Sequence, residues 1–316
     1  MDKGKKDFLR LSDISKDEGL EIIERAKDLK IRLKNEIKYQ PMSGKTLAMI
    51  FEKPSTRTRI SFETGIYQLG GYPIYLNSGD IQLSRGESVA DTARVLSRFV
   101  NMVMIRAFSQ DMVDEFADES TVPVINGLTD LTHPCQVMSD LFSIAELRGW
   151  HFDDLAVTYV GDGNNLTNSW ITAAVTFGFT LTISCPEELM PDGEILSLGM
   201  EKSEGKIKIE KDPMVGVANA EVVYTDTWMS MGDAPDIKER KLDLLKPYQI
   251  NEELLDYAPK DAVVMHCLPA HRGEEITDEV MDGKHSIVYD QAENRLHVQK
   301  AIMDILNQRQ EALGVS

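Results

Sequence analysis

Short, continuously apolar segments alternate with longer amphipathic segments along the first half of the chain. Apolar residues at positions 20, 22, 23, 26 and 29 fit helical periodicity, and Ser15 and Glu18 before them have the spacing of a capping box. Short apolar runs without that periodicity are typical of buried strands. In chain order, the pattern predicts a strand at 46–51, a helix at 59–69 stopped by Gly70 and Gly71, a strand at 73–77, a helix at 87–99 and a strand at 102–107.

The same alternation restarts after about Gly149. It predicts a strand at 155–160 followed by a turn, a helix at 168–179, strands at 180–186, 221–226 and 262–269, and a last helix at about 292–311. Strands that alternate with helices indicate a parallel sheet with helices on both faces. The sequence therefore predicts an α/β fold with two doubly wound parallel-sheet domains, joined by interdomain helices.

The composition narrows the class of protein without changing this fold prediction. The chain has 316 residues, 42% of them hydrophobic, which is enough for a sizeable core. A net charge of −18 argues against a nucleic-acid or acidic-membrane partner and makes a local cluster of arginines more informative. Three sparse cysteines, Cys135, Cys185 and Cys267, suggest reduced thiols. Since there is neither a leader nor an apolar run of membrane-spanning length, we expect a soluble cytoplasmic protein.

The segment STRTR combines hydroxyl groups and arginines where the strand at 46–51 gives way to a helix. Ser55 is a natural N-cap, and the first turn of the helix offers free N–H groups and a positive dipole end. Thr56 and Thr58 add hydroxyl donors, and Arg57 adds a planar fork that binds two oxygens. We interpret the segment as a seat for a phosphate-like dianion. The alternative is a capped helix with exposed arginines.

Polar residues also follow other predicted strands, where open α/β sheets bind ligands. Arg106 closes the strand at 102–107, either as a solvated edge or as a site residue. Asn165 ends GDGNN, which is either a tight turn or an incomplete dinucleotide fingerprint without its third glycine. Asp226 ends the predicted strand at 221–226, and Cys267 lies near the end of the predicted strand at 262–269. A lone cysteine there is otherwise a small buried hydrophobic residue.

Four motifs, STRTR, TDLTHPCQ, DTWMSMG and HCLP, follow one another in the order found in a known family. The chain resembles the aspartate/ornithine carbamoyltransferase family over essentially its whole length, and its last two motifs resemble the ornithine branch. The resemblance implies a carbamoyl-phosphate-binding domain at 1–134, an ornithine-binding domain at 135–290, and a C-terminal helix at 291–316 that packs back on the first domain.

The resemblance also implies roles for individual residues. It makes Arg57, Arg106, His133, Asp226 and Cys267 catalytic. Ligands of carbamoyl phosphate would be Ser55, Thr56, Arg57, Thr58, Gln82, Arg106, His133, Gln136, Cys267, Leu268 and Arg295. Ligands of ornithine would be Asn165, Asp226, Ser230 and Met231. Gln82 would reach into a neighbouring subunit of a homotrimer. The alternative is that the polar segment around it is an ordinary surface loop that connects two elements. Similarly, a lone His133 could simply cap the interdomain helix.

The reaction that the resemblance implies is carbamoyl transfer from carbamoyl phosphate to the δ-amine of ornithine, giving citrulline and phosphate in arginine metabolism. The substrate's own amine is the nucleophile, so we expect no covalent enzyme intermediate and no cofactor. Six dispersed histidines and the cysteine spacing give no metal motif. The Leu268–Pro269 peptide is a candidate for the cis form, because only X–Pro bonds adopt it at small cost.

Three alternatives stay open at the level of sequence. The acceptor could be aspartate, putrescine or an N-acylated ornithine, although an acidic ligand at Asp226 suits the free amine of ornithine. The GDGNN turn could belong to a nucleotide-dependent dehydrogenase. The chain could also be a non-catalytic sensor of phosphate-like anions.

Overall fold

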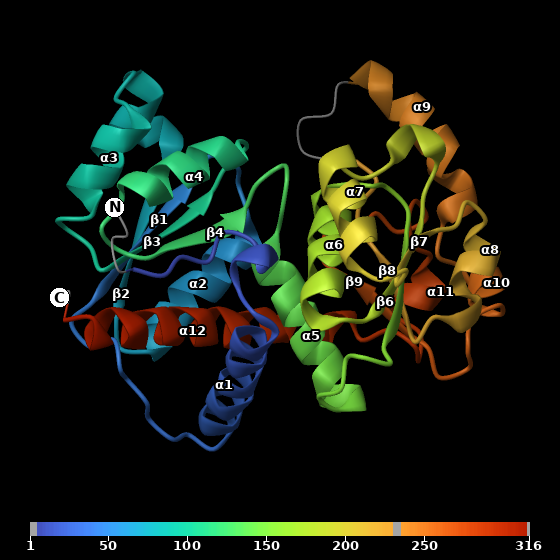
Figure 1. The fold of residues 1–316 in the computed structure, drawn as a ribbon, viewed down its shortest axis with the longest axis horizontal. Helices are drawn as coiled ribbons and strands as arrows, with labels where there is room; N and C mark the ends of the chain where they lie inside the picture. Colours follow the sequence, from blue (N-terminus) through green and yellow to red (C-terminus); the bar gives the residue numbers. More distant parts are fainter. Residues whose placement is uncertain (1–4, 230–234, 315–316) are drawn as a thin grey trace. The chain divides into compact units, whose positions relative to one another are not determined.

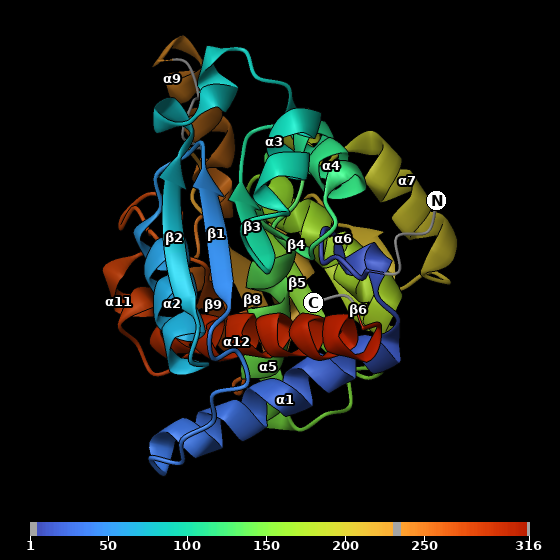
Figure 2. The same cartoon turned by 90° about the vertical axis from the view of Figure 1, so that its left-hand side faces the viewer.

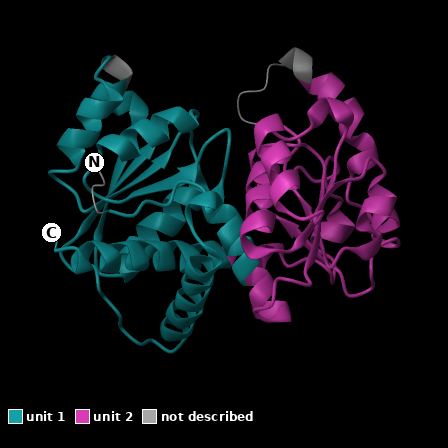
Figure 3. Ribbon diagram, viewed as in Figure 1, with its two compact units in different colours: residues 1–142, 294–316 teal, residues 143–293 magenta. Residues whose placement is uncertain are grey.

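The computed structural model describes residues 5–229 and 235–314, without the side chains of residues 84, 85 and 235–237. The chain forms two compact units (Figures 1 and 3). Unit 1 comprises residues 1–142 and 294–316, and unit 2 comprises residues 143–293. Two helices, α5 (Pro134–Arg148) and α12 (Val288–Ala312), each run from one unit into the other. None of the helices within the described ranges combines the length and hydropathy needed to span a bilayer.

Unit 1 is built on a four-stranded parallel sheet in the order β2-β1-β3-β4 (Figure 2). Its helices α3 and α4 cover one face, and α2 and α12 cover the other (Figures 1 and 2). The strands are β1 (Thr46–Phe51), β2 (Tyr72–Asn77), β3 (Met102–Arg106) and β4 (Val124–Leu128). The helices contained in this unit are α1 (Lys16–Lys34), α2 (Thr56–Gln68), α3 (Val89–Leu96) and α4 (Gln110–Glu119).

The unit 1 core explains why its central strands are apolar on both sides. Five of the six residues of β1 and all of β3 are buried, because helices lie over both faces of the sheet. Ala48 and Val103 pack with Phe116 of α4 in one such cluster. Gly70 ends the α2 segment with φ +91°, a conformation that an L side chain rarely adopts. The Ser15–Glu18 capping box is present at the start of α1, as predicted.

Unit 2 is built on a five-stranded parallel sheet in the order β7-β6-β5-β8-β9. The strands are β5 (Ala156–Val160), β6 (Thr180–Ser184), β7 (Ile207–Ile209), β8 (Val222–Thr225) and β9 (Val263–His266). The helices are α6 (Asn165–Phe177), α7 (Gly193–Lys202), α8 (Pro213–Gly216), α9 (Pro235–Leu245), α10 (Glu252–Leu255) and α11 (Asp278–Met281).

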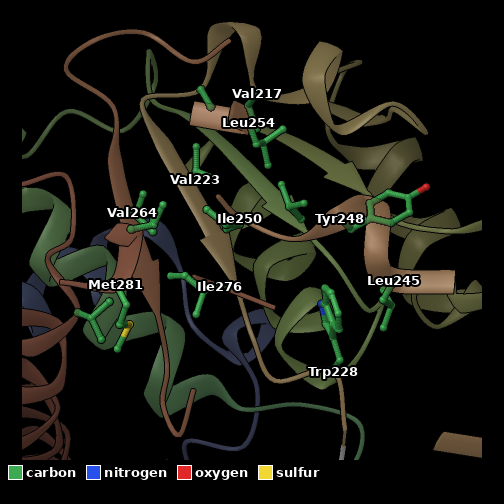
Figure 4. Close-up of a cluster of buried hydrophobic side chains, with 14 residues drawn as sticks. Val217, Val223, Trp228, Leu245, Tyr248, Ile250, Leu254, Val264, Ile276 and Met281 are labelled. Atoms are coloured by element: carbon green, nitrogen blue, oxygen red, sulfur yellow. The ribbon is translucent and has the colours of Figure 1, made fainter. Parts of the chain in front are cut away.

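A buried apolar cluster holds one side of this second sheet (Figure 4). Val223 and Val264 project from the adjacent strands β8 and β9. Leu245 ends α9, which lies between these strands in the sequence, and Ile276 lies after β9. Trp228, only 2% exposed, belongs to the same cluster. Its burial ties down the segment directly after β8, and that segment carries Asp226.

The structure confirms the predicted fold class of two parallel-sheet α/β domains. β1 has the predicted bounds, and the predicted strands at 102–107, 180–186, 221–226 and 262–269 are present with ends shifted by a few residues. The strands β4 and β7 and the helices α4 and α7 to α11 were not predicted. The two units divide within α5 and within α12, whereas the limits at 134/135 and 290/291 were drawn for substrate-binding domains and stay predictions.

Candidate active site

Ser55 caps helix α2, as its sequence position predicts. It has an extended backbone, and its hydroxyl accepts a hydrogen bond from the Thr58 N–H at 3.3 Å. Ser55 and Arg57 are half-buried and Thr56 is exposed, so this first turn is open to a ligand while its far side is packed. Free N–H groups and the helix dipole make such a turn favourable for an anion.

Arg106 and Arg295 converge on one buried hydroxyl group in unit 1. The parallel register pairs Phe51 with Arg106, which places the carboxyl ends of β1 and β3 side by side. Arg106 Nη1 donates to Thr58 Oγ1 at 3.3 Å, and Arg295 Nη2 donates to the same oxygen at 2.9 Å. Thr58 is fully buried, and the two arginines are 6% and 4% exposed. Guanidinium groups removed from water in this way favour a bound anion.

His133 lies at the start of α5 and is 4% exposed. Burial, followed by the positive charges of Arg295, Arg106 and Arg57, lowers the pKa of His133 well below its ordinary value. The imidazole is therefore neutral near pH 7, with one nitrogen that donates and one that accepts. His133 thus lies near enough to the three arginines for their charges to act on it.

Gln136 follows one turn later on α5 and is 1% exposed. Its Nε2 donates to Asp140 Oδ1 at 2.9 Å, which fixes the orientation of the amide. Its Oε1 is buried and has no hydrogen-bond partner within the described residues. A buried acceptor without a donor is costly unless a ligand supplies one. Gln136 therefore offers an acceptor for an N–H group.

Gln82 is the one predicted residue of unit 1 for which the structure gives no link to this cluster. It is exposed in the 3-10 helix Gln82–Arg85, and its side chain makes no hydrogen bond to any of the residues that the structure describes. Its position is compatible with a surface loop, the alternative stated above.

In unit 2, Asp226 is the centre of a second polar cluster. The residue follows β8 and is 6% exposed. Its Oδ1 accepts from Cys267 Sγ at 2.7 Å and from the Thr227 N–H at 2.7 Å, and its Oδ2 accepts from Asn164 Nδ2 at 2.8 Å. Because β8 and β9 are neighbours, Thr225 pairs with His266, and Asp226 and Cys267 lie together one residue further on.

Asn164 was not among the residues selected from the sequence, which favoured Asn165. Asn164 is the N-cap of α6 and accepts from the N–H groups of Leu166 and Thr167, while its amide nitrogen holds Asp226. Asn165 is the first residue of the helix and is half-buried. The only available signal was that a GDGNN turn before a helix needs a cap, and either asparagine satisfies that rule.

A buried histidine–glutamate pair, His266 and Glu275, stabilises the loop that carries Cys267 and Leu268. His266 Nδ1 accepts from the Leu268 N–H at 2.8 Å, and Nε2 lies 3.0 Å from Glu275 Oε1. His266 and Glu275 are 1% and 0% exposed. Leu268 has φ +59°, and the Leu268–Pro269 peptide is cis. Neither His266 nor Glu275 was selected from sequence, because their role depends on contacts within a folded loop.

Among the residues that the structure describes, two groups of side chains have ligand atoms close enough together for a metal ion. Asp226, His266 and Cys267 form one group, and His271, Glu274 and Glu275 form the other. In the first group, both nitrogens of His266 and the Cys267 sulfur already take part in the hydrogen bonds described above. A metal ion bound there would displace those hydrogen bonds.

Two predicted ornithine ligands, Ser230 and Met231, lie outside the described residues. Arg272, a few residues after the HCLP motif, lies at the surface, where it pairs with Asp278 and Asp282. These ion pairs account for that arginine without a role in a binding site.

Comparison with known proteins matches both halves of the chain to one family. Residues 6–146 match the model described as "Aspartate/ornithine carbamoyltransferase, carbamoyl-P binding domain". Residues 153–306 match the model described as "Aspartate/ornithine carbamoyltransferase, Asp/Orn binding domain".

Individual relatives agree over nearly the whole length. An ornithine carbamoyltransferase of Syntrophus aciditrophicus is 54% identical and covers 96% of this chain and 99% of its own. One from Archaeoglobus fulgidus is 52% identical over 94% of this chain and 96% of its own. A solved structure of ornithine carbamoyltransferase from Pyrococcus furiosus superposes with a TM-score of 0.90 at 45% identity, covering 95% of this chain and 96% of that one.

Proposed function

The chain belongs to the aspartate/ornithine carbamoyltransferase family, and from that premise we propose that it transfers the carbamoyl group of carbamoyl phosphate to the δ-amine of L-ornithine. The products are L-citrulline and phosphate, and the reaction belongs to arginine metabolism. Unit 1 binds carbamoyl phosphate in this proposal and unit 2 binds ornithine. The assignment follows from the chemistry of the two polar clusters.

One observation carries the proposal: Arg106 and Arg295 both donate to the buried hydroxyl of Thr58, at the first turn of α2. Cationic donors at a helix N-terminus suit a phosphate dianion. Ser55, Thr56 and Arg57 belong to the same turn and complete the seat. Since both oxygen lone-pair directions of Thr58 are used by the arginines, its own hydroxyl proton is left to donate toward a ligand.

The carbamoyl group has a carbonyl oxygen and an NH₂ group, and unit 1 offers a partner for each. His133 is neutral, so it donates a hydrogen bond to the carbonyl oxygen without adding charge to the ground state. The orphaned Gln136 Oε1 accepts from the NH₂ group. Negative charge that develops on the carbonyl oxygen during attack is stabilised by Arg106, Thr58 and His133.

The acceptor amine must be neutral before it attacks. An alkylamine with a pKa near 10.4 is only ~0.1% unprotonated at pH 7.4, which costs about 4 kcal/mol at roughly 1.36 kcal/mol per unit. Asp226 and Cys267, hydrogen-bonded to each other at 2.7 Å, are the groups that offset this cost in the proposal. Asn165, Ser230 and Met231 would bind the amino-acid end of ornithine, and Leu268 would contact the carbamoyl group.

The bonding changes balance without a covalent enzyme intermediate. The δ-nitrogen lone pair forms a bond to the carbamoyl carbon, and the bond from that carbon to the bridging oxygen of phosphate breaks. The electron pair leaves with phosphate, and the proton lost by the amine ends on phosphate or solvent. Positioning of two reactants and electrostatic stabilisation then supply the rate enhancement.

A homotrimer with Gln82 donated to a neighbouring site is part of the proposal. Unit 1 also carries several large apolar side chains that are exposed in the single chain. Ile60, Tyr67 and Phe99 are 56%, 72% and 73% exposed. An exposed Gln82 on the same unit fits a residue that acts in a partner's site. The cytoplasmic location stays a prediction from the cysteine pattern.

The function is tested by measuring the carbamoylated product that forms from carbamoyl phosphate with ornithine, putrescine, N-acetylornithine and aspartate in parallel. We expect kcat/KM for ornithine to exceed that for each alternative by at least two orders of magnitude. An enzyme with a preference for putrescine or aspartate would contradict the assignment of Asp226 and its neighbours. No carbamoyl transfer to any of the four amines would contradict the proposal as a whole.

The shared site is tested by mixing two inactive variants. Gln82→Ala and Arg57→Ala should each be inactive, but a mixed trimer contains some sites with an intact Gln82 from one chain and an intact Arg57 from another. We expect mixing after gentle dissociation to restore measurable citrulline formation. Persistent inactivity of mixtures that demonstrably exchange subunits would show that Gln82 acts within its own chain.

A further inference from the structure

A cavity of about 200 Å³ that is open to solvent lies in unit 1 and shares no lining residue with the proposed phosphate seat. It is lined by the C-terminal part of α1, the segment after it, and one residue each from α2 and α12. Figure 2 shows α1 beside α12 at this side of the unit. At about 30 Å³ per water, the cavity has room for a ligand of about six or more non-hydrogen atoms. Its lining residues are Leu29, Arg32, Leu33, Glu36, Ile37, Lys38, Tyr39, Gln68 and Lys300.

Lys300 contributes a buried ammonium group to this cavity. Its residue is 4% exposed, and its Nζ donates to Gln68 Oε1 at 2.8 Å. Within the described part of the chain, that is its one hydrogen bond, and it forms no ion pair there. An ammonium group has three donors, so a ligand acceptor would satisfy capacity that the protein leaves unused. Burial lowers the pKa of Lys300 to about 8, as expected for a cation without a nearby carboxylate.

The packing around Lys300 directs its side chain into the cavity. A Cβ atom at Gly65 of α2 would come within 3.2 Å of Lys300 Cγ and 3.1 Å of Met303 Cε. Glycine at this position therefore lets α2 and α12 approach closely, with the aliphatic part of Lys300 between them. The ammonium group emerges at Gln68, the last residue of α2.

The remaining lining residues define what could bind beside Lys300. Leu29, Leu33, Ile37 and Tyr39 make the wall largely apolar. Arg32 is already engaged, because its Nε donates to Asp28 Oδ2 at 2.7 Å and its guanidinium lies 5.0 Å from the centre of the Tyr39 ring.

The charges of the lining favour an anion locally. Lys38 and Lys300 are cations, Arg32 is balanced by Asp28, and Glu36 is the one carboxylate among the lining residues. The lining itself therefore has more cations than carboxylates, although Asp28 and Asp304 accept hydrogen bonds from Arg32 and Tyr39.

We propose that this cavity, which we call the Lys300 cavity, binds a small organic monocarboxylate whose carboxylate pairs with the Lys300 ammonium and whose hydrocarbon body packs on Leu29, Leu33 and Ile37. A phosphate dianion fits less well, because one ammonium and an apolar wall supply too few donors for its oxygens. A neutral apolar molecule would leave the ammonium unsatisfied. The inference does not depend on the proposed carbamoyl transfer.

The proposal is tested with hexanoate as the probe and with hexan-1-ol and hexylamine as neutral and cationic analogues of equal length. Calorimetric titration of the full-length protein should show saturable binding of hexanoate, at least tenfold tighter than that of either analogue. Lys300→Met keeps the aliphatic packing against Gly65 and should weaken hexanoate at least tenfold. Lys34→Met is the matched control, since it removes an equally positive but exposed lysine of α1 that does not line the cavity.

Two results would overturn the proposal. The first is an absence of saturable hexanoate binding to the unmodified protein at millimolar concentration. The second is equal hexanoate affinity in the unmodified protein and in Lys300→Met. Lys300→Gln provides a second variant if Lys300→Met does not fold, and unchanged hexanoate affinity in Lys300→Gln would be equally contrary.

Discussion

Replacing Thr58 with valine tests the phosphate seat most sharply, because valine keeps the shape of threonine and removes its hydroxyl group. That oxygen accepts from Arg295 at 2.9 Å and from Arg106 at 3.3 Å, and all three side chains are buried. The substitution therefore leaves two guanidinium groups without this acceptor and removes one donor to the ligand.

The expected magnitude follows from these contacts. Hydrogen bonds to charged groups contribute about 1.5–3 kcal/mol each, and the 3.3 Å contact is longer than the usual 2.9–3.0 Å and so is the weaker one. Removing one donor to a developing oxyanion costs about 2.7–4 kcal/mol in other enzymes. We therefore expect Thr58→Val to lower kcat/KM for carbamoyl phosphate about 100- to 1,000-fold.

The assay is citrulline formation at saturating ornithine with carbamoyl phosphate varied. Thr58→Ser is the matched control, because it keeps the hydroxyl group and should stay within about tenfold of the unmodified enzyme. Circular dichroism of each variant establishes that the fold is intact. A kcat/KM for Thr58→Val within about fivefold of the unmodified value, or an effect confined to the KM of ornithine, would refute the reasoning.

Three other predictions address different parts of the molecule. Asp226→Asn should raise the KM for ornithine by about 10- to 150-fold and leave that for carbamoyl phosphate nearly unchanged, as expected for loss of about 1.5–3 kcal/mol at a charged partner; equal effects on both would contradict its assignment. Because the pKa of His133 is lowered in the folded state, only the unfolded state takes up a proton on this imidazole as the pH falls below 6.5. Between pH 7.5 and 5.5, the free energy of unfolding measured with urea should therefore fall by about 1.4 kcal/mol less in His133→Gln than in the unmodified protein. Equal decreases in the two proteins would argue against a neutral His133. Lys300→Met should raise the free energy of unfolding at pH 7 by about 1–3 kcal/mol, because it removes a buried ammonium group whose pKa is lowered to about 8. Lys34→Met, the control, should change the free energy of unfolding by less than about 0.5 kcal/mol. A Lys300→Met variant that is less stable than the unmodified protein would contradict this account.

The position of the proposed phosphate seat could be read from the sequence because its parts are local. Ser55 to Thr58 follow a strand and open a helix, so capping rules and the helix dipole suffice to place them. Arg106 was predictable because a charge that closes an apolar strand must lie at the sheet edge. Arg295 was different: nothing local links a residue near the start of the last helix to Thr58, and only the resemblance suggested it.

The substrate-side cluster in unit 2 was predictable in outline and not in detail. Parallel strands bring Asp226 and Cys267 together once β8 and β9 are known to be neighbours. The choice between Asn164 and Asn165 depends on a single residue of register at the start of α6, which lies below the precision of pattern-based boundaries. The His266–Glu275 pair depends on how a loop folds back, and loop geometry leaves no periodic signal in the sequence.

Helices and strands were likewise predictable where the signal is local in the sequence and were missed where it depends on tertiary contacts. The continuously apolar strands β1 and β3 could be recognised because both of their faces are buried. β4 was missed, since its sequence, VINGL, includes a glycine and a buried asparagine whose side chain bonds to Leu9 and Thr132. β7 is three residues long and carries an exposed lysine. Their strand character comes from pairing within the sheet rather than from local preference.

The central claim is that the first turn of α2 receives the phosphate of carbamoyl phosphate, and a crystal structure with a phosphonate analogue of that substrate tests it directly. The account predicts phosphonate oxygens within hydrogen-bond distance of the N–H groups of residues 56–58 and of the Arg57 guanidinium, with Arg106 beside the carbamoyl oxygen. A phosphonate bound at any other place on the molecule, with this turn unchanged, would contradict it.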